Sequence, residues 1–447
     1  MKQQNDSKIR TNRTFLQTGK VALSLIVLFS KIIYDLIMKV LYVTGLGSLT
    51  GGGGNKRVFE ILKRARKFNV DYVPVLEERN YPFALKSFPE LGNVIREIGG
   101  YAINLRPNSK FPLSLYMNIP SVSSKIAEIA RNEKVDLILS AHESFDLIHI
   151  VRLASKETSI PWSTILQLTP IIGTLKCEVR GPLDAIKESG AGGNFLKILV
   201  RYSKMVSIIK NLKETLSLAV SFSIPYELSF FCPELKIKVL NPSVGVDEEI
   251  SSAKPINADF DAIYFARLHP LKGLLDIPFI WKKVVENKPD AKLIVAGSWQ
   301  SMEYKYEFYN LCKKLDICKN IEYVGFLPKR TLYSYVKSAK LLVYPSYLDA
   351  FPLTVIEALA CGIPVVAYNI VPIRLSFRTK SVIKVRSQEK SKFAECIINI
   401  LEDEELRKRL SNDALTFASK YNWDSAAKEE FDSIKGVLSY WEEKMQI

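Results

Sequence analysis

Histidine is scarce in this chain of 447 residues, with only His142, His149 and His269 present. No H-E-x-x-H pattern occurs, which argues against a His-rich metal site. None of the six cysteines belongs to a C-x-x-C pair, so buried free thiols are expected. Zinc-finger spacing, a basic region leading into heptads and an aromatic RNA-binding signature are all missing, and we therefore expect no nucleic-acid partner.

The chain also lacks an uninterrupted apolar run of the about 18 residues that a membrane-spanning helix needs. Residues 1–37 come nearest: a basic, polar leader precedes the apolar stretch 21–30, but Lys31 and Asp35 interrupt the continuation of this stretch. Three interpretations stay open for this leader: a signal anchor, an interfacial helix with Lys31 at the headgroups, or a start-site artefact. The last arises because MKVLYVTGLG, from Met38, is typical of a protein start.

Positive charge is what the chain has in excess. Lys and Arg number 62 against 47 acids, a net charge of +15, and 47% of the residues are hydrophobic, enough for two packed cores. The charge indicates either a solvated basic surface or an anionic partner such as a phosphate-bearing ligand or an acidic lipid. Residues 194–213 form a basic amphipathic pattern that indicates either contact with a membrane surface or a core-packed helix with a solvated basic face. Its cations are Lys197, Arg201, Lys204, Lys210 and Lys213.

Short apolar runs alternate with helical patterns from Met38 onward, which predicts βαβ units and parallel sheets. The predicted strands are 40–44, 72–75, 102–105, 137–139, 162–166 and 218–220, then 262–266, 292–296, 322–324, 341–344, 364–367 and 381–385. A Pro-, Ser- and acid-rich stretch at 238–261 separates the two series. We predict an α/β fold of two Rossmann-like, doubly wound domains, 38–245 and 246–420, with a leader (1–37) and a C-terminal helix (421–447). A ligand is expected in the cleft between the domains.

The stretch YLDAFPLTVIEALACGIPVVA (347–367) predicts a strand, a loop and a helix. Pro352 suits the first helical turn, and Gly362 suits the left-handed position after the helix. The free amide groups at residues 353–355 would point toward a ligand, and the helix dipole favours a diphosphate there. Asp349 lies at the mouth of this helix and Glu357 one to two turns inside, where carboxylates can accept hydrogen bonds from sugar or ribose hydroxyl groups. The alternative is a capping Asp349 and a solvated Glu357.

The stretch FARLHPLKG (265–273) adds two cations to the same domain. Arg267 and Lys272 follow a predicted strand, and both suit phosphate oxygens. Gly273 permits close approach of the backbone. The alternative is two surface cations without a ligand, but two cations and two acids on the loops of one domain favour a binding site.

In the first domain, four consecutive glycines precede a helical pattern. The dinucleotide fingerprint is incomplete and no G-K-[ST] follows, but Gly52, Gly53 and Gly54 would still expose amide groups to an anion or a sugar. The alternative is a flexible turn. His142 and Glu143 follow strand 137–139, where a histidine has either a catalytic or a structural role.

Five landmarks carry a resemblance to a known family: the glycines at 51–54, NPSVGVD at 241–247, Arg267 with Lys272-Gly273, the stretch 324–346, and LDAFPLTVIEALACGIPVVA at 348–367. From Met38 nearly to its end, the chain resembles family 4 of the retaining glycosyltransferases, which have the GT-B architecture. The resemblance implies that Glu357 holds the ribose of a nucleotide and that Asp349, where the family has Glu, touches the donor sugar. Arg267 and Lys272 match the cations on the donor diphosphate, and Gln167 stands where the family often has His.

The resemblance further implies transfer of a sugar, with retention, from a nucleotide-sugar donor to a hydroxyl acceptor, without a metal or another cofactor. We expect a glycan or lipid-linked acceptor and a protein on the cytosolic face of a membrane. The candidate catalytic residues are Arg267, Lys272, Asp349 and His142, and the candidate binding residues are Gly52, Gly53, Gly54, Gly273, Leu353, Thr354, Val355 and Glu357. The alternatives are a sugar-nucleotide epimerase, a phosphorylase or a non-catalytic homologue on the same fold.

Overall fold

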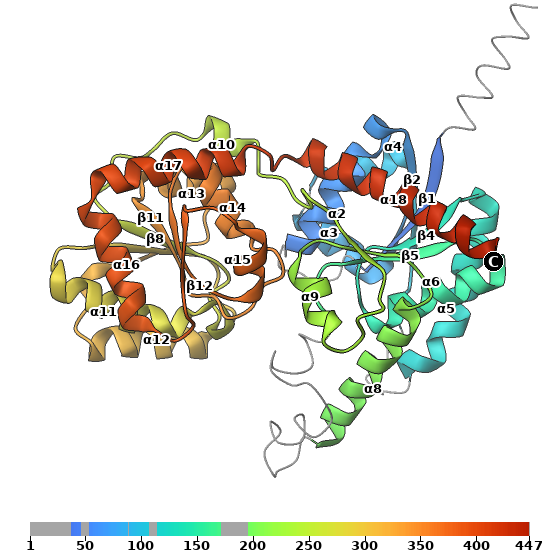
Figure 1. Cartoon of the computed structure of the whole chain (residues 1–447), viewed down its shortest axis with the longest axis horizontal. Coiled ribbons are helices and arrows are strands. Elements are labelled where there is room, and N and C mark those ends of the chain that lie inside the picture. Colours follow the sequence, from blue (N-terminus) through green and yellow to red (C-terminus); the bar gives the residue numbers. More distant parts are fainter. Residues whose placement is uncertain (1–36, 46–52, 88, 107–113, 171–194, 447) are drawn as a thin grey trace, which may run out of the picture.

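The computed structural model describes residues 37–45, 53–87, 89–106, 114–170 and 195–446. The predictions made for residues 1–36 and for Gly52 lie outside this part of the chain. Figure 1 shows two α/β lobes side by side, with the C-terminal chain returning from the second lobe to the first. Among the described helices, none combines the length and apolar character that a membrane span requires.

The first lobe is built on a parallel sheet of seven strands in the order β3-β2-β1-β4-β5-β6-β7. Its strands are β1 (Met38–Thr44), β2 (Val70–Glu77), β3 (Tyr101–Ile103), β4 (Leu137–Ser140), β5 (Trp162–Leu166), β6 (Ser217–Ala219) and β7 (Ile237–Val239). Its helices are α2 (Gly53–Arg64), α3 (Tyr81–Ser87), α4 (Leu91–Ile98), α5 (Ser114–Glu133), α6 (Phe145–Thr158), α8 (Phe195–Leu212) and α9 (Ser223–Ser229).

The second lobe has a parallel sheet of six strands in the order β10-β9-β8-β11-β12-β13. Its strands are β8 (Ala262–Phe265), β9 (Leu293–Ala296), β10 (Ile321–Gly325), β11 (Leu341–Tyr344), β12 (Val365–Tyr368) and β13 (Val382–Val385). Its helices are α10 (Glu249–Ser252), α11 (Ile277–Asn287), α12 (Met302–Lys314), α13 (Lys329–Ser338), α14 (Leu353–Ala360), α15 (Val371–Ser376), α16 (Lys390–Glu402) and α17 (Glu404–Ala418).

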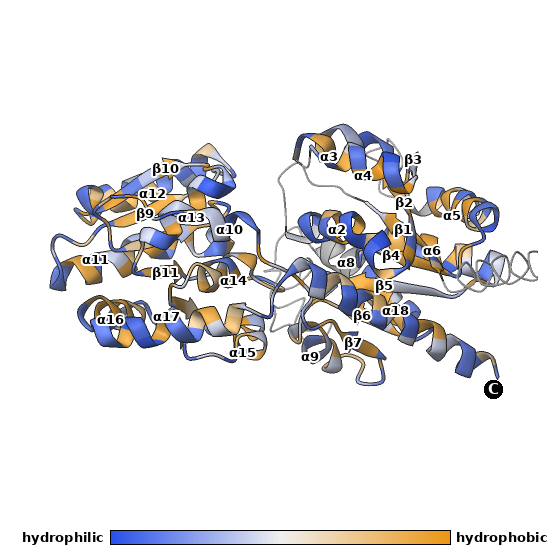
Figure 2. Ribbon diagram, turned by 90° about the horizontal axis from the view of Figure 1, so that it is seen from above, coloured by the Kyte–Doolittle hydropathy of each residue, from blue (hydrophilic) through white to orange (hydrophobic). Residues whose placement is uncertain are grey.

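The strands are apolar because helices cover both faces of each sheet. Figure 2 shows hydrophobic strands between helices whose outer faces are hydrophilic. Every residue of β4, β5, β8, β9, β11 and β12 is buried. The two sheets have the same doubly wound order, which confirms the predicted fold class. The exact domain boundaries stay a prediction.

Strand order fixes where a ligand can approach each lobe. In the first sheet the order reverses between β1 and β4, and in the second it reverses between β8 and β11. In doubly wound sheets the crevice at such a reversal, beyond the carboxyl ends of the strands, is where ligands bind. Gly53 begins the helix that follows β1, and the loops after β4, β8 and β11 carry His142, Arg267 and Asp349. These candidate residues of both lobes therefore lie at the reversals.

Helix α18 (Trp423–Met445) crosses back and packs on the first lobe (Figure 1). Asn422 caps it, because its side chain accepts a hydrogen bond of 2.7 Å from the amide of Ser425. A fully buried ion pair connects α18 to α2 of the first lobe, with 2.5 Å between Arg57 Nη2 and Glu430 Oε2. The hydroxyl group of Tyr72 donates to the same carboxylate over 3.1 Å. The two lobes are therefore joined by two chain crossings and not by the linker alone.

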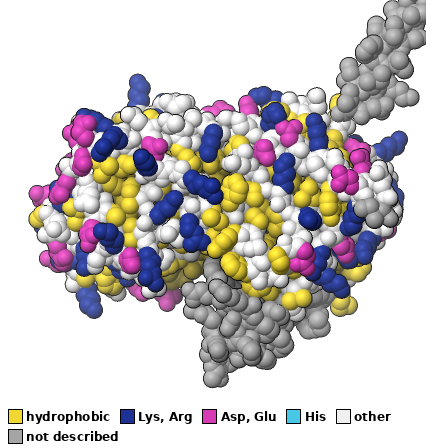
Figure 3. Space-filling model, in the orientation of Figure 1, with side chains coloured by type: hydrophobic (Ala, Val, Ile, Leu, Met, Phe, Trp, Pro, Cys, Tyr) yellow, Lys and Arg dark blue, Asp and Glu magenta, His cyan; other side chains and the backbone are white. Residues whose placement is uncertain are grey.

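The predicted basic helix forms as α8, although the side chains of residues 195–202 lie outside the described part. Lys204 lies over the Phe145 ring and Lys213 pairs with Glu234, while Lys210 is exposed. Figure 3 shows Lys and Arg side chains spread over both lobes on one face of the molecule rather than gathered over one element. Contact of α8 with a membrane stays a prediction.

Candidate functional site at the junction of the two lobes

Helix α14 starts at the edge of the second lobe as the sequence predicts. Gly362, after the helix, has a φ of 80°, the left-handed conformation that favours glycine. The amides of Leu353 and Thr354 precede the first intrahelical hydrogen bonds, as at any helix N-terminus. The amide of Val355 instead donates to Pro352 O over 3.1 Å, so the prediction of a third free amide is wrong. Two amide groups remain to receive an anion at this end.

The N-termini of α14 and α2 meet across the junction. A β-carbon built on Gly53 would lie only 3.0 Å from Leu353 Cδ1, although the two residues belong to different lobes. A β-carbon on Gly54 would lie 3.4 Å from Oε1 of Gln167, which follows β5. Neither α2 nor α14 has an acidic residue in its first turn to compensate the helix dipole. Two positive helix ends thus face one space, which favours an anion between them.

Lys272 and Asp349 form an ion pair beside α14. The distance from Lys272 Nζ to Asp349 Oδ2 is 2.5 Å, and the ammonium group also donates to Leu348 O over 3.0 Å. The buried hydroxyl group of Tyr344, in β11, donates to the same carboxylate oxygen. Burial, reinforced by the charge of Asp349, raises the pKa of Tyr344, so this phenol remains a donor. The structure therefore brings two candidate residues into direct contact.

Arg267 forms no ion pair with the residues that the structure describes. The residue is exposed. Burial lowers the pKa of His269, and the charges of Arg267 and Lys272 lower it further, so all three groups share one electrostatic neighbourhood. Arg267 is consequently the cation in this group that is available to a ligand.

Gly273 holds the Lys272 loop against β11. Its φ is 74°, and a β-carbon there would lie 1.9 Å from Pro345 O. We expect Gly273→Ala to cost more stability than Gly325→Ala, because Gly325 has a similar φ of 80° but nothing within 4 Å of the added carbon. The control should lose about 1–2 kcal/mol for the left-handed conformation alone. Urea unfolding of both variants checks this expectation, and equal losses would contradict it.

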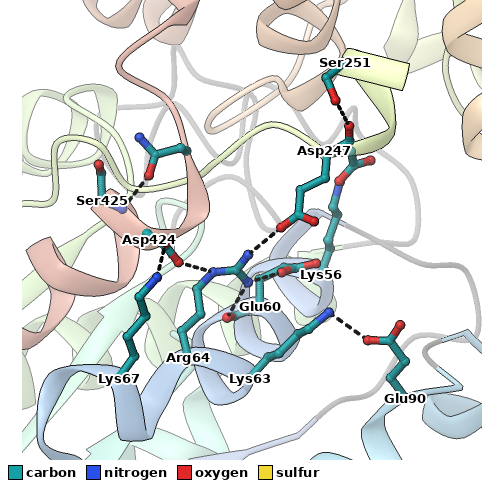
Figure 4. Close-up of polar contacts among 12 residues, drawn as sticks. Lys56, Glu60, Lys63, Arg64, Lys67, Glu90, Asp247, Ser251, Asp424 and Ser425 are labelled. Carbon is teal, nitrogen blue, oxygen red and sulfur yellow. Dashed lines mark hydrogen bonds and ion pairs between the residues drawn. The ribbon is translucent and has the colours of Figure 1, made fainter. Parts of the chain in front are cut away.

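Glu357 lies in a buried cluster of alternating charge. Its Oε1 is 3.4 Å from Lys56 Nζ of the first lobe and 3.2 Å from Lys329 Nζ of α13. Both ammonium groups also pair with Asp247 of the linker, and the hydroxyl group of Tyr333 donates to that carboxylate. Figure 4 shows Lys56 rising from its helix toward Asp247. The interpretation of Glu357 as a solvated residue is therefore wrong, since its side chain is only 6% exposed.

Within this cluster, the surroundings of Asp247 and Lys329 favour their charged forms. Burial alone would raise the pKa of Asp247, but Lys56 and Lys329 outweigh it and lower that pKa to about 2. Burial likewise opposes the charge of Lys329, and Glu357 with Asp247 raises its pKa. Two cations and two carboxylates thus neutralise one another at the junction.

His142 lies at the carboxyl end of β4, as predicted, but its surroundings disfavour a proton. Its Nε2 atom is buried and makes no hydrogen bond with the described residues. Burial, with the charges of Arg106 and Arg57, lowers its pKa to about 4. The neighbouring Glu143 is half-buried, and this desolvation raises its pKa, while its Oε2 accepts a hydrogen bond of 2.8 Å from the backbone amide of Gln167.

The low pKa of His142 predicts a pH dependence of stability. The unfolded chain binds a proton there below about pH 6.5 and the folded chain only below about pH 4, so stability should fall as the pH drops through that window. Between pH 7 and pH 5 the loss from this group is about 2 kcal/mol. We expect His142→Gln to lose less stability than the parent over this range, measured by urea unfolding at both pH values. Equal pH dependence would contradict a buried neutral imidazole.

A depression of about 590 Å³ opens at the carboxyl ends of β2 and β3, on the same sheet edge as His142. Its lining is mostly polar, with three basic residues and one acidic residue among eight: Glu78, Arg79, Asn104, Arg106, Asn118, Ser121, Val122 and Lys125. Arg106 also binds the buried carboxylate of Asp146. This depression has the size and the polarity for a small polar substrate.

The junction thus gathers Gly53, Gly54, Leu353 and Thr354 at facing helix ends, with Lys272, Asp349 and Gly273 beside them and Glu357 one turn away. Four further residues of this junction were missed as site residues, although all of them lie within or next to the quoted motifs: Lys56, Asp247, Lys329 and Tyr344. Among the described residues, no group of three or more His, Cys, Asp and Glu side chains is arranged to hold a metal ion. The prediction of metal-independent chemistry is not tested by that observation.

The fold is that of a two-lobed α/β protein with the GT-B architecture, and cations and helix N-termini gather at the junction of its lobes. The model of the family Glycosyl transferases group 1 matches residues 246–416 of this chain. This match covers the second lobe, and it includes Arg267, Lys272, Asp349 and Glu357.

Curated relatives are glycosyltransferases. An uncharacterised glycosyltransferase of Methanocaldococcus jannaschii is 28% identical over 220 residues, 46% of this chain and 55% of the relative. The D-inositol 3-phosphate glycosyltransferase of Corynebacterium efficiens is 26% identical over 213 residues, 46% of this chain and 50% of the relative. The chain thus spans about half the length of these two curated relatives in the matched regions.

Solved structures show the same architecture. HepE of Anabaena, in complex with UDP and glucose, superposes with a TM-score of 0.65 at 15% identity, covering 89% of this chain and 99% of that one. The sucrose-phosphate synthase of Thermosynechococcus elongatus gives a TM-score of 0.68 at 15% identity, covering 90% and 100%. At such identities the likeness concerns the fold alone.

Proposed function

We propose that this protein is a retaining glycosyltransferase that moves a sugar from a nucleoside-diphosphate donor to a hydroxyl group of an acceptor. The observation that carries the proposal is the meeting of two helix N-termini, at Gly53 and Leu353, beside Lys272 and Asp349. The diphosphate would lie between these helix ends with Arg267 alongside, and Glu357 would hold the ribose.

Catalysis in this proposal is mainly electrostatic. The bond from the anomeric carbon to the donor phosphate oxygen would break while a bond from this carbon to the acceptor oxygen forms on the same face, and negative charge would grow on the leaving diphosphate. The amide groups of Leu353 and Thr354, together with Arg267 and Lys272, would stabilise that charge, as preorganised donors do elsewhere. The incoming hydroxyl group would pass its proton to the donor phosphate, so that no protein nucleophile is needed. Asp349, held by Tyr344 and Lys272, would position the sugar.

For the acceptor we propose a molecule that carries an anionic group and is attached to, or presented at, the cytosolic face of a membrane. The depression lined by Arg79, Arg106 and Lys125 supports an anionic acceptor. The name of the Corynebacterium relative, a D-inositol 3-phosphate glycosyltransferase, points to the same chemistry. The net charge of +15 supports approach to an acidic membrane.

The test is a transfer assay with common nucleotide sugars and phosphorylated polyol or lipid-linked acceptors, in which proton NMR of the product reports its anomeric configuration. Transfer with retention, lost in Glu357→Gln, supports the proposal, and inversion would refute the retaining mechanism. Donor conversion without an acceptor would indicate an epimerase, and release of sugar phosphate on adding inorganic phosphate would indicate a phosphorylase. Failure to bind any nucleotide sugar would indicate a non-catalytic protein.

A further inference from the structure

Lys56 stands in a position that its own helix disfavours. It lies in the first turn of α2, where the helix dipole is positive and a cation is unfavourable. Its side chain is only 13% exposed, so the surrounding water compensates little of this cost. What compensates it are two carboxylates from outside the helix, Asp247 and Glu357. Such a buried placement needs a reason beyond the stability of α2.

The contacts of Lys56 tie together the elements that connect the two lobes. Asp247 belongs to the linker, and Glu357 belongs to α14 of the second lobe. The ammonium group also lies 5.7 Å from the ring centroid of Trp423, where the chain returns to the first lobe. At this point the two crossings touch, because a β-carbon on Gly245 would lie 2.2 Å from the Trp423 amide nitrogen. Lys56 therefore contacts both crossings and the helix that would receive the donor.

Lys56 and a ribose would use the same oxygen atom. Both Lys56 and Lys329 approach Oε1 of Glu357, at 3.4 Å and 3.2 Å. A ribose hydroxyl group that donated to this oxygen would weaken the longer contact first, and Lys56 would then lack one of its two anions. The helix ends at Gly53 and Leu353 lie three and four residues before Lys56 and Glu357, which at 1.5 Å per residue is about 4.5–6 Å along each helix. A diphosphate at those ends is within reach of the extended Lys56 side chain.

We propose that Lys56 is a donor-binding residue supplied by the first lobe: its ammonium group exchanges Glu357 for the donor diphosphate when the ribose takes Glu357. This inference rests on the proposed function and adds a specific role for the N-terminal lobe. The contact between Lys56 and Asp247 stays in place while the ammonium group changes its other partner. Lys329, anchored in the second lobe on the same two carboxylates, supports Glu357 and does not move to the diphosphate.

The test compares a nucleoside with its diphosphate. By calorimetry, the full-length protein, Lys56→Met and Lys329→Met are titrated with UDP, GDP and ADP and with uridine, guanosine and adenosine. One nucleoside and its diphosphate are expected to bind the parent protein. For this diphosphate, Lys56→Met should lower the affinity by about 10- to 100-fold, the range of a lost charge-assisted hydrogen bond. The nucleoside should bind as well as before or more tightly, since its competitor for Glu357 is gone.

Lys329→Met is the matched control, because it loses a contact with the same Glu357 oxygen and with Asp247. It should change the affinities of nucleoside and diphosphate by the same factor. The inference is overturned if Lys56→Met changes the affinities for nucleoside and diphosphate by the same factor. It is also overturned if Lys56→Met changes neither affinity. Should Lys56→Met fail to fold, Lys56→Gln retains a hydrogen-bond donor for the carboxylates and gives the same comparison. If the parent protein binds none of the three diphosphates, the proposed function itself has failed.

Discussion

Lys272→Met should lower the rate of sugar transfer by about 100- to 1,000-fold, the usual cost of removing one preorganised donor from a developing anion. The loss should appear in kcat, because the charge that Lys272 would stabilise grows only as the donor bond breaks. The protein should stay folded, since Asp349 keeps its bond from Tyr344 and a second one of 3.2 Å from the Ala350 amide.

The matched control for this variant is Lys288→Met. Lys288 forms a longer and more exposed lysine–carboxylate contact, 3.5 Å from Glu402, in the same lobe. Its replacement should leave the transfer rate within about twofold, because exposed ion pairs contribute little. A Lys272→Met enzyme with the kcat of the parent would remove this lysine from the catalytic groups.

Glu430→Ala should destabilise the protein by about 3–5 kcal/mol, because it leaves the guanidinium group of Arg57 buried without its counter-charge. The side chains of Arg57 and Glu430 are 1% and 0% exposed. Burial opposes the charge of Arg57, but Glu430 more than offsets it and raises the pKa of Arg57. The remaining bond, of 2.8 Å from Arg57 Nε to Ser243 O, does not neutralise the charge.

Urea unfolding followed by tryptophan fluorescence measures this loss, with Glu443→Ala as the control. Glu443 is exposed near the end of the same helix, so its replacement should change stability by no more than about 0.5 kcal/mol. Equal, small effects of both variants would show that α18 does not depend on the buried pair. Since α18 begins beside Lys56, a loosened helix should also weaken donor binding.

The central strands of both sheets could be predicted from the sequence because their local signal is strong. The strands 162–166 and 341–344 are found at the predicted residues, as continuous apolar runs between turn-forming segments. Strand β7 was missed because Ile237–Val239 is short and only half-buried at the edge of the sheet, so its pattern merges with the linker. A strand that is buried on both faces is recognisable in the sequence as an apolar run, and this pattern is weaker in a strand at the edge of a sheet.

Only those parts of the candidate site that depend on neighbouring residues in the sequence could be predicted. The loop of Lys272 and Gly273 and the helix mouth at Asp349 follow from strand, turn and helix signals, and the left-handed Gly273 confirms the close approach. The contact between Lys56 and Glu357 joins residues 301 positions apart, and no spacing rule reveals it. Asp247 lies in a quoted motif, but its partners depend on how the linker crosses between the lobes.

A crystal structure of the complex with the tightest-binding diphosphate decides whether a nucleoside diphosphate binds between the N-termini of α2 and α14. We expect this binding mode, with phosphate oxygens within hydrogen-bond distance of the Leu353 and Thr354 amides and of Arg267, and with a ribose hydroxyl group on Glu357. A nucleotide found instead in the depression lined by Arg79, Arg106 and Lys125, with Glu357 still paired to both lysines, would contradict it.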